Sequence, residues 1–306
     1  MNLIFGYIGY AFGYVLWLLY QVVSNYGVAI ILFTLISKIV LLPFSIKQQK
    51  SMTKNASFTR KQQEIRQKYA NDRQKMEQEI SQLYQKEGIS PTGGCLTMLA
   101  PFIIMFGVFY VVRNPLTNAL HIDSGKVTQA LEVLKQIPGV GVNFGNSMYG
   151  EIDIIKHFDQ LKSFLPMFSE SDVSSIEFFS KGFNFLGLDL LGTPSQSSFS
   201  SMLWLIPVLC LVSSWASQFI MQKLSGQAMQ QQGCMKYSLY LLPLISVYFS
   251  YIVPAAVGFY WVMSTLFSLV QSIILNKFYS AGLITAKSEA ARVVLREQQE
   301  KSVNKI

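Results

Sequence analysis

A single lysine lies inside an otherwise apolar stretch near the start of the chain. Lys38 stands within residues 28–46, which contain no other charged residue. With a helical rise of about 1.5 Å per residue, it lies about 13 Å from Lys47, the basic residue that follows the stretch. A cation at such depth in a bilayer costs about 2.5–3.5 kcal/mol, so it should face protein or a water-filled cavity. Lys38 is therefore a candidate binding residue for acidic or polar segments. The alternative is a lysine that only extends its amine toward the membrane surface.

Other polar side chains could share a cavity with this lysine. Thr34 precedes it by one helical turn and falls on the same helix face. Gln218 and Gln271 lie within two later apolar stretches. Together these residues predict a polar groove, although hydrogen bonding between helices would explain each glutamine equally well.

The sequence contains no pattern typical of an enzyme, a metal site or a cofactor site. No nucleophile elbow, P-loop or glycine-rich phosphate loop is present. His121 and His157 are not spaced with acidic residues as metal ligands, and we expect both to be ordinary surface histidines. The three cysteines lack metal-ligand spacing and do not suggest a disulfide framework; they are Cys95, Cys210 and Cys234.

The composition indicates which elements must position these residues. Of the 306 residues, 51% are hydrophobic and 14% are charged, against about 25% charged in soluble domains. Several apolar stretches approach the roughly 20 residues that cross a bilayer. We therefore predict an all-α polytopic membrane protein with a five-helix transmembrane core. The spans are expected at 24–46, 96–113, 201–222, 237–253 and 257–278.

The remaining segments connect or flank these spans. Residues 1–23 should form an N-terminal interfacial helix, although their length would also permit a sixth span. Residues 47–95 show two amphipathic patterns with a turn and a helix N-cap at Asp72, which predicts a helical hairpin. Residues 114–200 should hold short helices, such as 127–136 and 154–164, without a large independent domain. Residues 223–236 form a loop, and residues 279–306 form a basic tail.

The distribution of charge predicts the orientation. The net charge is +8, and no nucleic-acid motif accompanies it. Counted over residues 47–95, 222–236 and 277–306, the hairpin, the short loop and the tail together carry eighteen basic and eight acidic residues, whereas region 114–200 carries five basic and nine acidic ones. Because short cytoplasmic segments are rich in Lys and Arg, the hairpin, loop and tail should be cytoplasmic. Region 114–200 should lie outside the cell.

Several runs of residues resemble, in order and joint spacing, the YidC/Oxa-type membrane protein insertases. The resemblance covers nearly the whole chain except the middle of region 114–200. Its motifs are individually weak and jointly specific. They lie at residues 26–27, 33–43, 47–52, 65–69, 83–86, 91–95, 185–190 and 258–261.

This resemblance implies a five-helix core around a hydrophilic groove that opens to the cytoplasm and to lipid but is closed outside. The family usually carries an arginine on the first span, and Lys38 stands at the matching position. Lysine keeps the positive charge but lacks the planar guanidinium fork. Thr34, Tyr260 and Trp261 match groove or client-contact positions of the family. Without a large periplasmic domain, the chain resembles the Gram-positive form.

The resemblance implies an insertase and chaperone of the bacterial plasma membrane that works without ATP, alone or with the Sec translocon. Its expected partners are nascent membrane proteins, the ribosome, the Sec translocon and membrane lipids, with no direct nucleic-acid contact. Two other functions are open. A transporter or channel could bind a small anion at Lys38, although no internal repeat is found. A structural assembly factor would have no translocation role.

Overall fold

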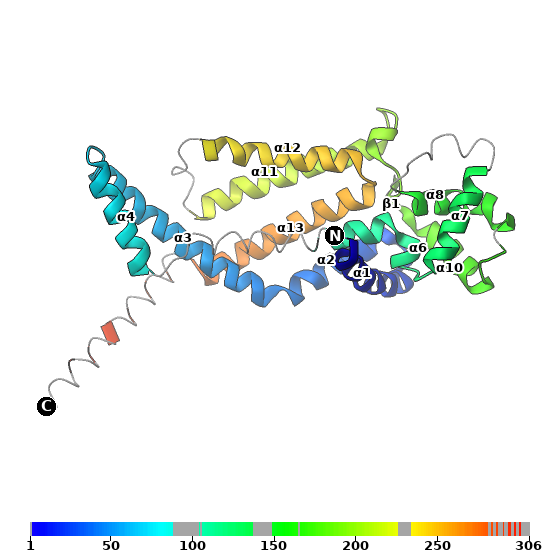
Figure 1. Ribbon diagram of the computed structural model, residues 1–306, viewed down its shortest axis with the longest axis horizontal. Helices are drawn as coiled ribbons and strands as arrows, with labels where there is room; N and C mark the ends of the chain where they lie inside the picture. The colour runs from blue at the N-terminus through cyan, green and yellow to red at the C-terminus, as the bar shows by residue number, and fades with distance from the viewer. Residues whose placement is uncertain are drawn as a thin grey trace. The chain divides into compact units, whose positions relative to one another are not determined.

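The computed structural model describes residues 2–87, 104, 106–136, 149–164, 166–225 and 234–280, and seven single residues between 283 and 300. Within these residues the chain is helical almost throughout, with one two-stranded sheet (Figure 1). It divides into two compact units, which are described separately. Unit 1 comprises Met1–Lys38, Leu99–Trp215 and Ser238–Phe267, and unit 2 comprises Ile39–Met98, Ala216–Tyr237 and Ser268–Ile306.

The first two helices are joined by a two-residue link. Helix α1 spans Asn2–Val23 and helix α2 spans Tyr26–Val40. Ser24 between them has a φ of 51°, in the left-handed region that ends helices. The side-chain oxygen of Asn25 then accepts a hydrogen bond from the Val28 N–H at 3.2 Å, which caps α2. The break that the sequence predicts near residue 24 is confirmed.

Helix α2 ends earlier than the sequence suggests. A new helix, α3, begins at Leu42 and continues to Lys68, and the two are bent by 61° at the break. Pro43 lies in the first turn of α3, where its missing N–H does no harm. In one continuous helix its ring would clash with the carbonyl four residues earlier. The expectation of an uninterrupted helix over residues 28–46 was therefore wrong. The distance of about 13 Å between Lys38 and Lys47 was calculated for one continuous helix, so it was wrong too.

Helix α1 packs closely on the chain that follows the second predicted span. Residues 106–113 are helical, and α6 (Pro115–Asn118) comes directly after them. A β-carbon added to Gly13 would overlap the backbone carbonyl of Asn118, so glycine is required for this approach. Half of the predicted span 96–113 lies outside the described residues.

The α6–α10 region, which we define as residues 115–136 and 149–200, is a cluster of short helices. They are α7 (Ser124–Gln136), α8 (Gly150–Lys156), α9 (Phe158–Leu161) and α10 (Glu170–Ser180), followed by strands β1 (Asn184–Phe185) and β2 (Leu188–Asp189). Helix α7 includes the predicted helix 127–136. The predicted helix 154–164 is instead interrupted at His157. Its backbone N–H and its ring Nδ1 both lie within hydrogen-bond distance of the Asp153 carbonyl, at 3.1 and 3.0 Å.

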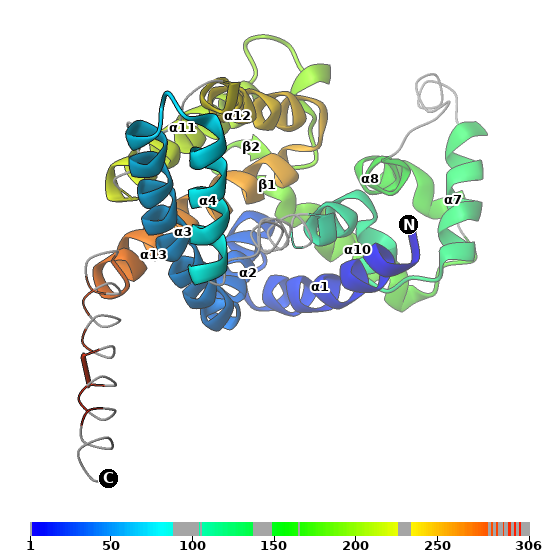
Figure 2. The same cartoon turned by 60° about the vertical axis from the view of Figure 1, so that its left-hand side comes forward.

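The core of this region is continuous with that of the first two helices. Its buried side chains, among them Leu134, Ile154 and Phe179, belong to one hydrophobic cluster with Tyr20 and Tyr26. As the sequence suggests, the region is not a large independent domain. In Figure 2 its helices lie together on the right, beside α1.

The last part of unit 1 contains the ends of three long helices. They are α11 (Leu205–Ser225), which follows a short 3-10 turn at Met202–Trp204, α12 (Cys234–Ile252) and α13 (Ala255–Phe278). The thiol of Cys210 donates to the Gly258 carbonyl at 3.6 Å, so α11 and α13 approach closely there.

By length and composition, three helices among the described residues could cross a membrane. The bent pair formed by α2 and the first part of α3 would make a fourth, and α12 contributes a shorter apolar helix, Pro243–Ile252. An all-α membrane protein is consistent with this result, while the full five-helix core stays a prediction. The three apolar stretches are Gly6–Val23, Met202–Leu224 and Ala255–Phe278.

In unit 2, helix α3 turns back into α4 (Arg73–Glu87), and the two run antiparallel (Figures 1 and 2). The Asp72 side chain accepts the Lys75 N–H at 3.0 Å, and the predicted N-cap at Asp72 is confirmed. The rings of Phe58 and Tyr84 meet with their centroids 4.6 Å apart. Most of the predicted loop 223–236 and tail 279–306 lies outside the described residues.

Candidate functional site

Lys38 and Thr34 lie on one face of α2, four residues apart. Lys38 is half-buried, and Thr34 is only 1% exposed. The Thr34 hydroxyl donates to the Ile30 carbonyl at 2.6 Å, so its proton is used within its own helix. Its oxygen can still accept a hydrogen bond. Helix α2 contains no charged residue other than Lys38. Lys38 is therefore the residue of this helix whose charge could attract an acidic segment.

The other two candidates in unit 1 lie near the start of α13. Tyr260 is buried, and its hydroxyl is hydrogen-bonded to Ser264 one turn later. Trp261 is half-buried. Of the two, only Trp261 therefore offers aromatic surface for contact with apolar segments, whereas Tyr260 packs in the interior.

Gln218 of α11 and Gln271 of α13 belong to unit 2, so four of the six predicted residues lie in one unit and two in the other. Both glutamines are half-buried. Each of them, like Lys38, takes part in at least one interaction within the structure. A groove that includes all six residues stays a prediction.

The β1–β2 hairpin connects the two helices of unit 1 that carry the candidates. The ring of Phe185 packs on α2 so closely that a β-carbon on Gly27 would overlap it. The same ring lies 5.1 Å from that of Phe259 in α13. The side-chain amide of Asn25 also donates to the Asn184 carbonyl at 2.9 Å. The hairpin therefore fixes the spacing of α2 and α13 at their adjoining ends.

The chain after β2 also caps α13. The N–H groups of Ala255 and Ala256 donate to the carbonyls of Gly192 and Leu190 at 2.8 and 2.9 Å. These N–H groups lie in the first turn of the helix, where no partner within the helix is available. Residues 185–190 resemble a motif of the insertase family, but their sequence predicts no role for them. Only the tertiary contacts reveal that they position α13.

His121 differs from the expected surface histidine. Its ring packs at a tilt against the rings of Tyr10 and Tyr14 of α1, with centroids 4.1 and 5.6 Å apart. Both ring nitrogens are covered and have no hydrogen-bond partner among the described residues. This burial lowers the pKa of His121, so the ring is neutral at pH 7. The prediction was wrong because the aromatic face of α1 is about a hundred residues away in sequence.

Glu151 of α8 is a buried carboxylate that sequence analysis did not identify. It is 8% exposed and accepts hydrogen bonds from the Thr117 N–H at 3.0 Å and from the Thr117 hydroxyl. Because Thr117 lies in α6, the carboxylate caps the start of that helix. Burial raises the pKa of Glu151, and the bonds from Thr117 and the nearby charge of Arg113 oppose the rise. No short-range pattern around residue 151 signals this contact.

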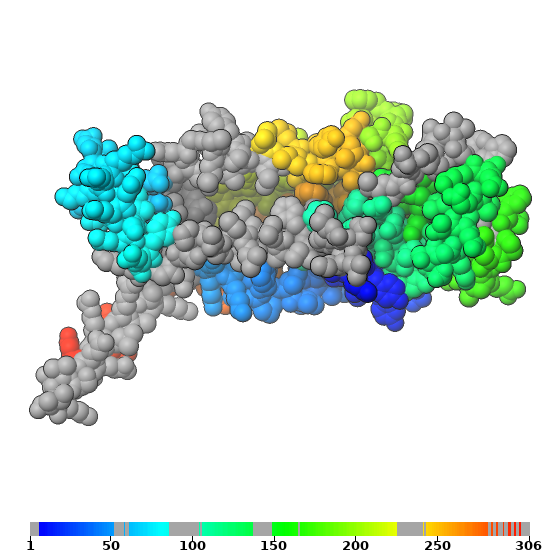
Figure 3. All heavy atoms as spheres, viewed as in Figure 1, coloured from blue at the N-terminus to red at the C-terminus, as the bar shows by residue number. Residues whose placement is uncertain are grey.

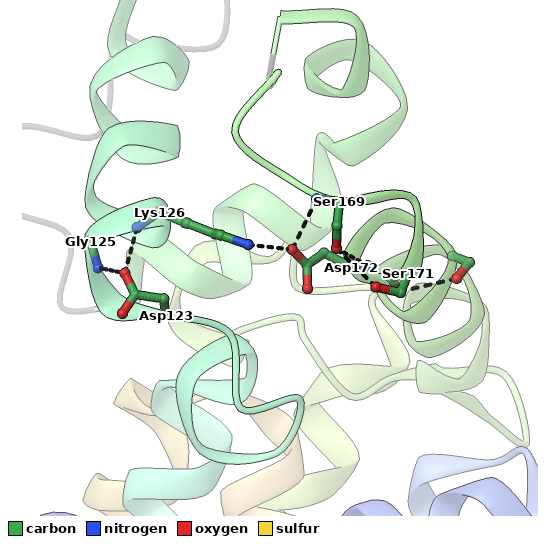
Figure 4. Close-up of polar contacts among 7 residues, drawn as sticks. Asp123, Gly125, Lys126, Ser169, Ser171 and Asp172 are labelled. Atoms are coloured by element: carbon green, nitrogen blue, oxygen red, sulfur yellow. Dashed lines mark hydrogen bonds and ion pairs between the residues drawn. The ribbon is translucent and has the colours of Figure 1, made fainter.

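An ion pair joins α7 to α10. Lys126 lies 2.7 Å from a carboxylate oxygen of Asp172, and Ser169 forms a reciprocal capping box with Asp172 at the start of α10 (Figure 4). The side chain of Asp123 likewise accepts from the Gly125 N–H at 2.8 Å at the start of α7. Burial tends to raise the pKa of Asp172, but the bonds from Lys126 and Ser169 outweigh it and hold the pKa low. These contacts stabilise the region and involve none of the groove candidates.

No group of three or more metal-binding side chains was found among the described residues.

Comparison with known proteins adds independent evidence. A family model described as "60Kd inner membrane protein" matches residues 18–282. A membrane protein insertase YidC from Fusobacterium nucleatum is 27% identical over 255 residues, which are 83% of this chain and 88% of that protein. One from Caldanaerobacter subterraneus is 43% identical over 102 residues, 33% of this chain and 50% of that protein. One from Prosthecochloris aestuarii is 25% identical over 271 residues, 89% of this chain but 36% of that protein.

Proposed function

The chain belongs to the family of 60Kd inner membrane proteins, the YidC/Oxa insertase family, and from this premise we propose that it inserts membrane proteins into the bilayer without ATP hydrolysis. The observation that carries the proposal is Lys38. It is a half-buried cation in an apolar helix, one turn from the buried Thr34. Burying a lysine in an apolar membrane segment costs free energy unless its amine faces protein or a water-filled cavity.

In the proposed mechanism, the polar end of a client enters a hydrated groove while its apolar segment moves into lipid. Lys38, Thr34, Tyr260, Trp261, Gln218 and Gln271 line this groove. The amine of Lys38 attracts acidic client residues, and groove water lowers the cost of transferring them. The contacts must be weak, because one site has to accept many sequences and release them.

The antiparallel helices α3 and α4 receive clients on the cytoplasmic side. Of the residues between 47 and 95, ten are basic and five acidic, and this excess of basic residues supports the proposed cytoplasmic side. The ribosome, the Sec translocon and membrane lipids are its proposed partners there. The tail, which is also basic, lies on the same side.

We place α1 along the outer interface rather than across the bilayer. It contacts the α6–α10 region from its middle to its C-terminal end: the Tyr10 ring lies 4.1 Å from that of His121, and the Tyr20 hydroxyl donates to the Phe178 carbonyl at 2.7 Å. The two contacts are separated by about 15 Å of helix rise, so this part of α1 stays beside that region, which supports an interfacial placement. Labelling of an Asn2→Cys variant from outside the cell would support this placement, and labelling only from the cytoplasm would contradict it.

Reconstitution tests the insertase activity directly. Liposomes containing the protein should convert a single-span client with a short acidic end into a protease-protected, inserted form, whereas protein-free liposomes should not. The same vesicles are tested for uptake of a labelled small anion. Uptake without client insertion would favour a transporter, and the absence of both activities would favour an assembly factor.

A further inference from the structure

The turn between β1 and β2 contains a residue that its backbone does not favour. The two central residues, Leu186 and Gly187, have φ angles of 51° and 85°. Two-residue hairpin turns with both φ angles positive prefer Asn-Gly, because a side chain with a β-carbon is strained in the left-handed region. The turn itself is well made, since the Asn184 side chain accepts the Gly187 N–H at 3.0 Å. Leucine thus occupies this position against the local preference.

This leucine is also almost fully exposed. Its side chain is 81% exposed at the tip of the hairpin. A strained, exposed apolar residue contributes nothing to a core. Because leucine is disfavoured in this turn and gains no packing there, we take a function of its side chain as the first hypothesis.

Two further exposed apolar side chains lie in the segment that leads into α11. A β-carbon on Gly187 would lie 3.4 Å from the sulfur of Met202, so the turn sits beside that residue. Met202 is 55% exposed, and Phe199, stacked on Trp204 at 4.5 Å, is 86% exposed. We call Leu186, Phe199 and Met202 the apolar tip. In Figure 3 the residues that lead into α11, coloured lime green, are visible at the surface.

The apolar tip continues directly into one face of α11. Met202 is the first residue of the apolar stretch Met202–Leu224. Exposed apolar side chains follow it at helical spacing, on the same face of the helix. They are Leu205, Val208, Val212 and Trp215.

We propose that the apolar tip inserts into the lipid of the outer leaflet and anchors the β1–β2 hairpin there. The occupant is lipid because the tip extends the exposed stripe of a helix long and apolar enough to span the bilayer, and none of its three side chains is charged. Since Phe185 and Asn184 of the same hairpin hold α2 and α13 together, the anchor would also steady the closed end of the proposed groove. The inference requires α11 to lie in the bilayer but does not require insertase activity.

Site-specific fluorescence in proteoliposomes tests this contact. In a full-length protein whose three cysteines are replaced, a nitrobenzoxadiazole probe is attached to a Leu186→Cys variant. The matched control is Gln129→Cys, an exposed position on α7. Lipids with a nitroxide near the headgroup should quench the probe at 186 several-fold more than the probe at 129, and aqueous iodide should show the reverse order. Equal quenching by iodide at both positions would overturn the proposal. So would protection of position 186 that appears only when a client is added.

A second variant separates lipid contact from folding. Leu186→Asn suits the left-handed turn and should leave the thermal midpoint unchanged or higher. It should nevertheless reduce lipid quenching of a probe placed at Phe199→Cys, whereas Leu186→Met should not. Unchanged quenching in the asparagine variant would show that leucine is not the anchor. Because lipid quenching is compared without a client in both tests, failure here is distinguishable from failure of the proposed insertase activity.

Discussion

Charged groups occur in two contrasting settings, the α6–α10 region and helix α2. In the α6–α10 region, Glu151 caps α6 and Asp172 pairs with Lys126, so these carboxylates hold one helix to another. Helix α2 instead carries one cation, Lys38, in an apolar segment with no acidic residue. The hydrogen bonds and the ion pair of these carboxylates show that they stabilise the packing of the helices. The contrast indicates that removing them should reduce stability, whereas removing the lysine should reduce activity.

The largest expected effect is on the stability of the α6–α10 region. Glu151→Ala leaves the Thr117 N–H and hydroxyl without their buried partner and should destabilise the region by about 3 kcal/mol. Hydrogen exchange in nanodiscs should report faster exchange in residues 115–118 and 150–156. Insertion per folded molecule should change little.

Glu151→Gln is the matched control for that variant. Its amide can accept from the Thr117 N–H and donate to the Thr117 hydroxyl, so most of the protection should return. If amide exchange in the alanine variant is as slow as in the glutamine variant and the unmodified protein, the carboxylate cap does not stabilise this region. The contrast with α2 then fails.

The second effect concerns activity. Lys38→Met removes the charge but keeps a long apolar side chain, and it should lower insertion of clients with acidic outer ends by about tenfold, equivalent to about 1.4 kcal/mol. Lys38→Arg keeps the cation and should retain insertion. The measurement uses matched clients that differ only in acidic residues, at equal amounts of protein. Equal insertion by the methionine variant across this series would assign Lys38 no role as a cation.

The features that could be predicted from the sequence depend on neighbouring residues. The break at residue 24 and the cap at Asp72 follow from turn and capping residues in the local sequence. Pro43 also marks a helix boundary, since it lies in the first turn of α3, where a proline is tolerated. The apolar stretches were recognisable because length and hydropathy alone identify candidate spans.

The features that were missed depend on contacts between distant segments. Glu151 accepts a hydrogen bond from Thr117, which lies 34 residues earlier in the sequence. His121 is covered by Tyr10 and Tyr14 of α1. Phe185 packs against Gly27 and Phe259 through a hairpin whose partners cannot be read from its own sequence. The site residues themselves could be proposed from a charge in an apolar segment and from resemblance, but their mutual arrangement could not.

The smallest effect concerns the pH dependence of the Lys126–Asp172 pair, which is partly exposed. Because the folded-state pKa of Asp172 is lowered, its stabilisation is present above its pKa in the unfolded chain, about 3.9. It is lost as the pH falls through the folded pKa. Solvent screening limits the contribution to about 1 kcal/mol or less. Glu151 has the opposite sign, because its raised pKa means that mild acid favours rather than weakens the folded state.

The pH series is measured as hydrogen exchange at the start of α10, after correction for the intrinsic rate. Between pH 7 and pH 3, protection of residues 170–173 should fall in the unmodified protein. Lys126→Met should lower that protection at pH 7 and flatten its dependence on pH, while leaving insertion unchanged. Asp172→Asn should behave similarly, because it also removes the charge that titrates. If both variants retain the full dependence on pH, another group titrates there, and the ion pair does not link α7 to α10 in solution.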